Sequence, residues 1–468
     1  MTFSSVIFLF AFLPVTFLLY AICRNDLVRN ILLLAASLVF YAVGEPVAVL
    51  IMIVSIILNY FLGIQASKEK GDKAAVALAV VLNIGLLVVF KYLGFLTETF
   101  NSITSLSLPV PKIRLPIGIS FFTFQGLSYV IDVYREKKMV QRSLMKVMLY
   151  ISFFPQLIAG PIVKYHDIEA QMDKREFSAD RAARGVKRFI VGLAKKVLIS
   201  NQMGLVADAV FATKLSQLGW GPAWIGAVCY SLQIFFDFSG YSDMAIGLGC
   251  MFGFDFRENF NYPFISANMQ EFWRRWHISL STWFKEYVYI PLGGNRRGKG
   301  RAIFNRSVVF LLTGLWHGAN LTFLVWGMLH GAFLLIEGAG WLPTKKKAFR
   351  PIGHVYSLLV IITTFVIFRA DTLTQGFGVI GKMFSGAAGS APENAAIYAL
   401  CSPLFLTALA AAVLFSTPIV PKLGERIAKT KAAPAAEYVA YFGTLVMFAL
   451  CVLSLVASEY NPFIYFRF

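Results

Sequence analysis

One histidine in the middle of the chain is placed for proton transfer. His317 lies between Trp316 and Gly318, at the junction of two apolar segments, and Asn320 follows it closely. A neutral imidazole suits proton abstraction near neutral pH, and small neighbours leave room for a substrate to approach. His317 is therefore our candidate general base, with Trp316 and Asn320 as lining residues. The alternative is an ordinary core histidine bonded to a carbonyl, which is the role we expect for His330.

A second histidine lies in a basic, aromatic-rich stretch. The segment EFWRRWHISLSTWFKEYV spaces its tryptophans at helical intervals, which predicts one amphipathic helix through His277 at the membrane boundary. Arginines in and after this segment could hold the phosphates of a cytoplasmic donor. Membrane topology explains the same charges and is the alternative. The candidate phosphate-binding residues are Arg274, Arg275, Arg296 and Arg297.

Polar side chains also cluster in FFDFSGYSDMAIGLG, a stretch too apolar for a surface loop. Ionisable groups at membrane depth are costly, so such a cluster more often lines a cavity than faces lipid. For any single charged group, a satisfied ion pair is the alternative. The five cysteines are scattered without metal-ligand spacing, and we expect no bound metal and no resident cofactor. The residues expected to line a tunnel are Asp237, Ser239, Tyr241 and Asp243.

The composition places all of these groups inside a membrane protein. The 468 residues are 57% hydrophobic and 15% charged, with apolar runs near the length that crosses a bilayer. The net charge is +18, but the excess Lys and Arg lie in short loops between apolar runs, so nucleic acid is not an expected partner. The first run lacks the features of a cleaved signal peptide. Spans are predicted at about residues 3–22, 29–43, 46–64, 74–96, 354–370, 396–416 and 438–457.

Basic residues occupy alternate loops, which the positive-inside rule assigns to the cytoplasm. Both termini are then extracytoplasmic, and the number of full crossings is odd, about eleven. The middle of the chain is less regular, because proline and glycine interrupt its apolar runs. We expect broken, re-entrant or horizontal helices there, a half-span at 146–160, and a cavity. The prediction is a single integral membrane domain, 1–468, with N-terminal spans (1–110), a core (111–342), and C-terminal spans with an extracytoplasmic tail (343–468).

Six motifs occur in order along the chain: LPIGISFFTFQGLSYVIDVYR, FFPQLIAGP, DFSGYSDMAIGLG, EFWRRWHISLSTWF, YIPLGGNR and LTGLWHGAN. Together they resemble the membrane-bound O-acyltransferase family, in particular its bacterial branch typified by the alginate O-acetylation protein. The resemblance implies an all-α, polytopic fold around a central tunnel in the bacterial cytoplasmic membrane. It also implies acyl transfer across the membrane, with His317 and His277 as the two functional positions.

The resemblance implies transfer of acetyl from a cytoplasmic thioester, most simply acetyl-CoA, to an extracytoplasmic polysaccharide or peptidoglycan. His317 would act as base, and His277 would orient the donor or stabilise an oxyanion. A separate SGNH-hydrolase-type transferase is the expected partner, since the chain has no soluble domain to grip a polymer. Two alternatives remain open, namely D-alanyl transfer from a carrier protein and, in another class, a secondary transporter or channel.

The tail SEYNPFIYFRF surrounds Tyr465 with phenylalanines. One interpretation is an aromatic belt that anchors the last helix at the interface. The other comes from a resemblance to the C-terminal motif of a small partner peptide in the related D-alanylation system, which implies that the Tyr465 hydroxyl is an acyl relay. A phenol is easier to deprotonate than a sugar hydroxyl, and its ester leaves well in the next transfer.

Overall fold

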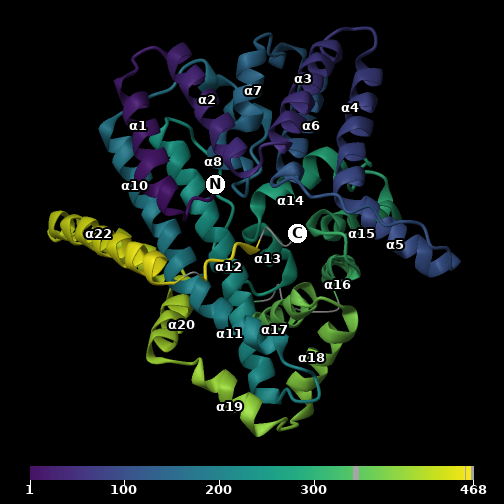
Figure 1. The fold of residues 1–468 in the computed structure, drawn as a ribbon, viewed down its shortest axis with the longest axis vertical. Helices are drawn as coiled ribbons and strands as arrows, with labels where there is room; N and C mark the ends of the chain where they lie inside the picture. Colours follow the sequence, from purple (N-terminus) through teal and green to yellow (C-terminus); the bar gives the residue numbers. More distant parts are fainter. Residues whose placement is uncertain (341–346, 459, 465–468) are drawn as a thin grey trace. The chain divides into compact units, whose positions relative to one another are not determined.

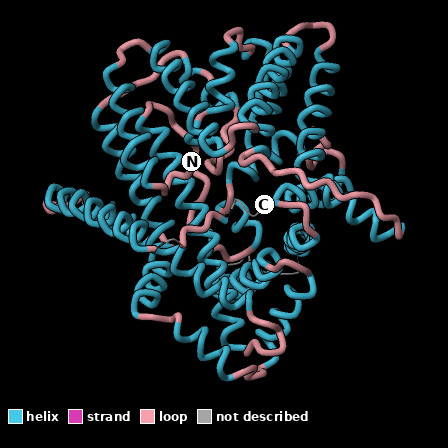
Figure 2. The backbone as a smooth tube through the Cα atoms, in the orientation of Figure 1, coloured by secondary structure: helices cyan, strands magenta, loops and turns pink. Residues whose placement is uncertain are grey.

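The computed structural model describes residues 1–340, 347–458 and 460–464, and its regular structure is helical throughout (Figures 1 and 2). The described residues contain no strand, which confirms the all-α prediction. Backbone contacts divide the chain into two units. Unit 1 comprises Met1–Phe189 and Ser242–Glu258, and unit 2 comprises Ile190–Tyr241 and Asn259–Phe468.

Unit 1 carries the N-terminal helices, and buried amides join two of them. Asn83 Nδ2 donates to Asn59 Oδ1 at 2.9 Å, which satisfies polar groups that lipid cannot. Gly126 leaves room for this pair, because a Cβ there would lie 2.7 Å from the Asn59 side chain. The helices are α1 (Leu13–Ile22), α2 (Asp26–Gly44), α3 (Ala48–Ala66), α4 (Asp72–Leu87), α5 (Leu93–Thr104), α6 (Ile119–Arg135), α7 (Leu144–Ser152), α8 (Phe154–Leu157) and α9 (Tyr165–Ile168).

Helices α10 (Ala179–Ala194) and α12 (Trp220–Met251) have residues in both units, and the remaining helices belong to unit 2. A π-helical turn, η5 (Lys195–Ser200), joins α10 to α11 (Asn201–Ala212). The others are α13 (Met269–Arg275), α14 (Ile278–Phe284), the π-helical turn η7 (Lys285–Tyr289), α15 (Gly298–His317), α16 (Leu321–Gly338), α17 (Arg350–Arg369), α18 (Leu373–Ser385), α19 (Ala391–Ala399), α20 (Pro403–Phe415), α21 (Ile419–Ile427) and α22 (Ala433–Ala457).

The number of membrane-crossing helices differs from the prediction. In the described part of the chain, seven helices are long and apolar enough to cross a membrane, or eight if α19 and α20, bent by 71°, form one span. About eleven full crossings were predicted, an odd number because the basic loops assign both termini to the extracytoplasmic side. The difference arises because several apolar runs are divided into shorter helices, as in the first run, where the apolar helix Phe8–Ile22 falls below the length of a full span.

The predicted interruptions in the middle of the chain are present. Helix α7 ends at Ser152, so its 9 residues span about 14 Å and do not cross a bilayer, as expected for a half-span. Gly118, with φ 79°, precedes α6, and Gly293 and Gly294 take positive φ in the turn before α15. The irregular backbone thus falls where proline and glycine indicated it.

Candidate active site

His317 is the last residue of α15, at the turn of a tightly packed helical hairpin. Glycines let α15 and α16 approach closely, since a Cβ on Gly314 would lie 2.5 Å from the Phe323 carbonyl oxygen. Asn320 caps α16 by accepting a hydrogen bond from Thr322 N at 3.0 Å. The hairpin therefore fixes the position of His317, and Asn320, predicted as a lining residue, acts as a helix cap.

Aromatic rings surround the His317 imidazole. Ring centroids lie 4.9 Å away for Trp316, 5.1 Å for Trp326 and 5.0 Å for Phe368. His317 is only 6% exposed. Such an apolar enclosure limits the access of water to the imidazole.

His277 does not lie within a helix, and the prediction of one continuous amphipathic helix is wrong. The helix is broken into α13 and α14, and His277 stands at the break with φ 44° and ψ 54°, in the left-handed region. A segment from elsewhere in the chain replaces the helical hydrogen bonds, because Asn261 N donates to Arg275 O at 2.9 Å and Ile278 N donates to Asn259 O at 2.9 Å. Tertiary pairing thus overrides the helical periodicity.

The hydrogen bonds of Asn259 fix the tautomer of His277. Asn259 Oδ1 accepts from Ser279 N at 3.1 Å, so the amide oxygen faces this group of residues. His277 Nδ1 lies 3.2 Å from the same oxygen and must therefore carry the proton that it donates. In the neutral ring Nε2 is then the basic atom.

One indole connects the two candidate histidines. Trp316 makes ring contacts with His277 at 5.6 Å and with His317 at 4.9 Å. The two residues are 40 positions apart in the sequence, His277 at the break between α13 and α14 and His317 at the end of α15. The structure therefore brings both predicted histidines to a single aromatic cluster.

His330, by contrast, is bonded at both ring nitrogens within the core. Trp273 Nε1 donates to His330 Nδ1 at 3.2 Å, so Nε2 carries the proton and lies 3.0 Å from Thr364 Oγ1. An imidazole held in this way has a structural role, as the sequence led us to expect.

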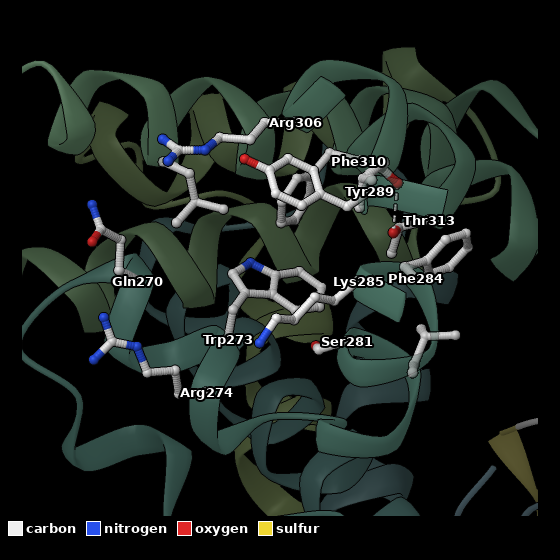
Figure 3. Close-up of a pocket in the computed structure, with 13 residues that line it drawn as sticks. Gln270, Trp273, Arg274, Ser281, Phe284, Lys285, Tyr289, Arg306, Phe310 and Thr313 are labelled. Carbon is white, nitrogen blue, oxygen red and sulfur yellow. Dashed lines mark hydrogen bonds between the residues drawn. The ribbon is translucent and has the colours of Figure 1, made fainter. Parts of the chain in front are cut away.

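A cavity of about 370 Å³ lies in unit 2 and is lined by residues of the same helices, although the three histidines themselves do not line it (Figure 3). Aromatic side chains form much of its wall, and three cations reach it, from Arg274 on α13, Lys285 on η7 and Arg306 on α15. Figure 3 shows the Trp273 indole between the Arg306 side chain and the side chains of Arg274 and Lys285. The lining residues are Gln270, Trp273, Arg274, Leu280, Ser281, Phe284, Lys285, Tyr289, Arg306, Val309, Phe310, Thr313 and Leu334.

The cavity and His317 share one face of α15. Arg306, Phe310 and Thr313 line the cavity at spacings of four and three residues, and His317 follows Thr313 by one further turn. Groups bound in the cavity would therefore lie along the face that ends at the candidate base.

The other predicted phosphate-binding arginines do not line this cavity. Arg275 is paired with Glu271, with Nη2 and Oε1 2.9 Å apart. Arg296 and Arg297 are exposed in the turn before α15. Of the four arginines predicted, only Arg274 lines the cavity, and the cations that the sequence analysis missed are Lys285 and Arg306.

The predicted tunnel residues on α12 separate into different environments, and none of them lines the cavity of Figure 3. Asp237 forms a buried ion pair with Lys196, and Tyr241 stacks on Phe463 with centroids 4.0 Å apart. Asp243 belongs to unit 1, where it pairs with Arg188 at 2.6 Å. Ser239 is buried. Tyr465 lies outside the described residues.

The comparisons with known proteins identify the family of the chain. The model of the membrane-bound O-acyltransferase family matches residues 119–374, a range that holds both histidines and every residue lining the cavity. The chain belongs to this family, and it is therefore an O-acyltransferase of the membrane.

Particular members of the family are similar over most or all of the chain. The probable alginate O-acetylase AlgI of Pseudomonas putida is 38% identical over 100% of both chains. The peptidoglycan O-acetyltransferase of Helicobacter pylori is 36% identical over 81% of this chain and 79% of its own. The teichoic acid D-alanyltransferase of Bacillus subtilis is 31% identical over 53% of this chain and 65% of its own.

Proposed function

We propose that the protein transfers an acetyl group from cytoplasmic acetyl-CoA for O-acetylation of an extracytoplasmic polysaccharide, alginate-like, or of peptidoglycan. The observation that carries the proposal is the contact of His317 and His277 with one indole, on the helix whose face also lines the cavity. Relatives named for alginate and peptidoglycan O-acetylation match most or all of the chain, which supports this class of acceptor.

The cavity suits a thioester donor that carries phosphates. Its apolar wall can take an acyl chain and the pantetheine arm, while Arg274, Lys285 and Arg306 can neutralise phosphate oxygens. The donor is a co-substrate that enters and leaves, and acetyl-CoA is the thioester we assign.

In this proposal His317 acts as a general base in the acyl transfer. The imidazole accepts the proton of the acceptor hydroxyl while the oxygen attacks the thioester carbonyl. The tetrahedral intermediate then expels the thiolate, which takes the proton back from the imidazolium. His277, across Trp316, orients the donor or stabilises the oxyanion of the intermediate.

In this proposal Tyr465 is the first acceptor, and its phenyl ester hands acetyl onward outside the membrane. The receiving protein is a separate transferase of the SGNH-hydrolase type that grips the polymer. Both termini are extracytoplasmic in the bacterial inner membrane, as the distribution of basic loops indicates.

A second candidate is transfer of D-alanine from a carrier protein to a wall polymer. The similarity to a teichoic acid D-alanyltransferase favours it, although that match covers about half of the chain. Family membership argues against the transporter or channel alternative, because the family is one of acyltransferases. Purified protein supplied with labelled acetyl-CoA, or with a D-alanyl carrier, distinguishes the two donors by which label it takes up.

His317→Ala tests the base directly. Loss of a general base lowers the rate by about 10² to 10⁴, so we expect acetyl transfer from labelled acetyl-CoA to fall to background while membrane insertion is unchanged. His166→Gln is the matched control. This variant also lacks one imidazole, but His166 belongs to unit 1 and is not part of the candidate site. Full activity of His317→Ala would remove it from the base role. Tyr465→Phe, assayed in the same way, decides between relay and anchor.

A further inference from the structure

The last two described residues after α22 are buried in unit 2. In Figure 1 the chain leaves α22 and passes α12 before the described residues end. Phe463 and Ile464 are each 6% exposed, and Phe463 stacks on Tyr241 of α12. We call residues 460–464 the tail segment. An aromatic belt at a membrane interface does not require this degree of burial inside the protein.

A buried ion pair meets the main chain of the tail segment. Lys196 and Asp237 are each 1% exposed, and Lys196 Nζ lies 2.8 Å from Asp237 Oδ1. Besides this ion pair, the ammonium group donates to Asn201 Oδ1 at 2.8 Å and to the carbonyl oxygen of Pro462. The tail segment thus completes the hydrogen bonding of a buried cation.

The partners of Lys196 also contact the tail main chain. Asp237 Oδ2 accepts a hydrogen bond from Ile464 N at 3.0 Å. Asn201 accepts from Lys196, so its Nδ2 faces the tail, where it lies 3.3 Å from Tyr460 O. The tail main chain therefore offers two carbonyl acceptors, Tyr460 O and Pro462 O, and one amide donor, Ile464 N, to side chains of the protein.

Local backbone geometry builds this site. The turn η5 is π-helical, and Asn201 N donates to Lys196 O, five residues earlier. An i to i+5 bond brings Lys196 and Asn201 to the same side, which ordinary α-helical geometry does not, and such turns are common at functional sites. Gly240, three residues after Asp237, lets η5 approach α12, because a Cβ there would lie 3.2 Å from Lys196 N.

A second contact holds the start of the segment. The Tyr460 hydroxyl donates to Asp208 Oδ2 at 2.7 Å, and Arg369 Nη2 donates to Asp208 Oδ1 at 2.7 Å. Gly204 leaves the room for this hydroxyl, since a Cβ there would lie 2.7 Å from it.

We propose that Lys196, Asp237 and Asn201 form a binding site for peptide main chain, and that its ligand is the tail segment of this chain. Lys196 and Asp237 are then positioning residues, because they hold the main chain up to Ile464, which directly precedes Tyr465 in the sequence. This consequence for Tyr465 rests on the proposed function. The binding of the segment itself does not.

The test replaces both charges at once. Removing one partner leaves a buried charge and can prevent folding, whereas replacing both by apolar side chains of similar volume often preserves the fold. We therefore choose Lys196→Met/Asp237→Leu and measure amide hydrogen exchange of the full-length protein in detergent. The expected result is exchange at least about tenfold faster in peptides covering the tail segment, because the Ile464 amide loses its acceptor.

The matched control is Arg188→Met/Asp243→Leu, which removes an ion pair between α10 and α12 that does not include the tail segment. It should leave exchange of the tail peptides unchanged. Lys196→Arg keeps the positive charge and the hydrogen-bond donors, so amide exchange of the tail peptides should stay as slow as in the unchanged protein. Tail exchange that stays slow in Lys196→Met/Asp237→Leu would overturn the proposal.

Steady-state kinetics test the positioning role separately from the proposed function. If the site positions Tyr465, Lys196→Met/Asp237→Leu lowers kcat at least about tenfold and leaves KM for the donor unchanged, since the donor cavity is untouched. Rapid tail exchange with a normal kcat would overturn the positioning role. If the proposed function is wrong, His317→Ala and Tyr465→Phe keep full activity. The hydrogen-exchange result does not depend on those assays, so it still tests whether Lys196 and Asp237 bind the tail segment.

Discussion

At the scale of single residues, backbone strain accompanies the candidate site. His277 and Tyr262 take φ of 44° and 48°, values that side chains other than glycine rarely adopt. Such conformations cost about 1–3 kcal/mol and persist only where surrounding contacts enforce them. Here the enforcing contacts are the hydrogen bonds of Asn259 and Asn261 to the break between α13 and α14. The protein keeps a strained histidine where glycine would fit better, which favours a role for the imidazole ring.

A pair of substitutions separates the ring from the backbone. His277→Gly and His277→Ala both remove the imidazole, but only glycine accepts the left-handed backbone without cost. We expect His277→Gly to be more stable than His277→Ala by about 1 kcal/mol, measured by thermal unfolding in detergent. Both variants should lose acyl transfer equally. If His277→Gly were both more stable and more active than His277→Ala, the imidazole ring would have only a structural role.

At the scale of elements, the α15–α16 hairpin depends on glycine. A Cβ on Gly327 would lie 2.5 Å from the Phe310 carbonyl oxygen and 3.0 Å from Gly314 Cα. These atoms belong to the helix backbone and cannot turn aside as a flexible side chain can. The separation of the two helices, and with it the position of His317, is therefore set by the absence of side chains at this crossing.

Gly327→Ala should push the two helices apart. We expect a loss of about 1–3 kcal/mol in stability, as for other overpacked interiors, together with reduced acyl transfer, because His317 moves with α15. Gly381→Ala is the control in α18, where a Cβ meets no heavy atom within 4 Å. It should be neutral or stabilise by about 0.5–1 kcal/mol, as alanine does in a helix. Equal melting temperatures for the two variants would contradict the crossing argument.

The sequence predicted individual helices better than it predicted the contacts between segments that are distant in the sequence. Long apolar runs such as 29–43 and 354–370 became the helices α2 and α17, because hydropathy over a whole span is a local property. The break at His277 was missed, since its cause is the pairing of residues 259–261 with another part of the chain. Lys285 and Arg306 were missed as cavity residues for the same reason. Motif resemblance, rather than spacing, selected His277.

At the scale of the whole molecule, the charge pattern along the chain predicts how the protein sits in its membrane. Basic residues recur at alternate connections, including Lys68 and Lys70 between α3 and α4 and Lys73 in the first turn of α4. The loop after α5 should then face the opposite side. A protein that passes acyl groups outward needs this orientation, with the donor site open to the cytoplasm.

Cysteine labelling tests the orientation. In a variant whose native cysteines are replaced by alanine, Ser107→Cys in the exposed loop after α5 should react with an impermeant maleimide on intact spheroplasts. Lys70→Cys, also exposed, should react only after lysis. Labelling in the reverse order would invert the topology and place the basic loops outside, against the positive-inside rule.

The way in which the tail segment is held has a further consequence for inhibition. Three of its contacts use main-chain atoms, namely Tyr460 O, Pro462 O and Ile464 N. Sequence variation along the segment leaves these atoms in place, so a short synthetic peptide with the same backbone pattern would offer Lys196 and Asp237 the same partners. A compound of this kind would compete with the enzyme's own tail segment instead of with the acyl donor, and it would be selected by its shape and its pattern of amide groups.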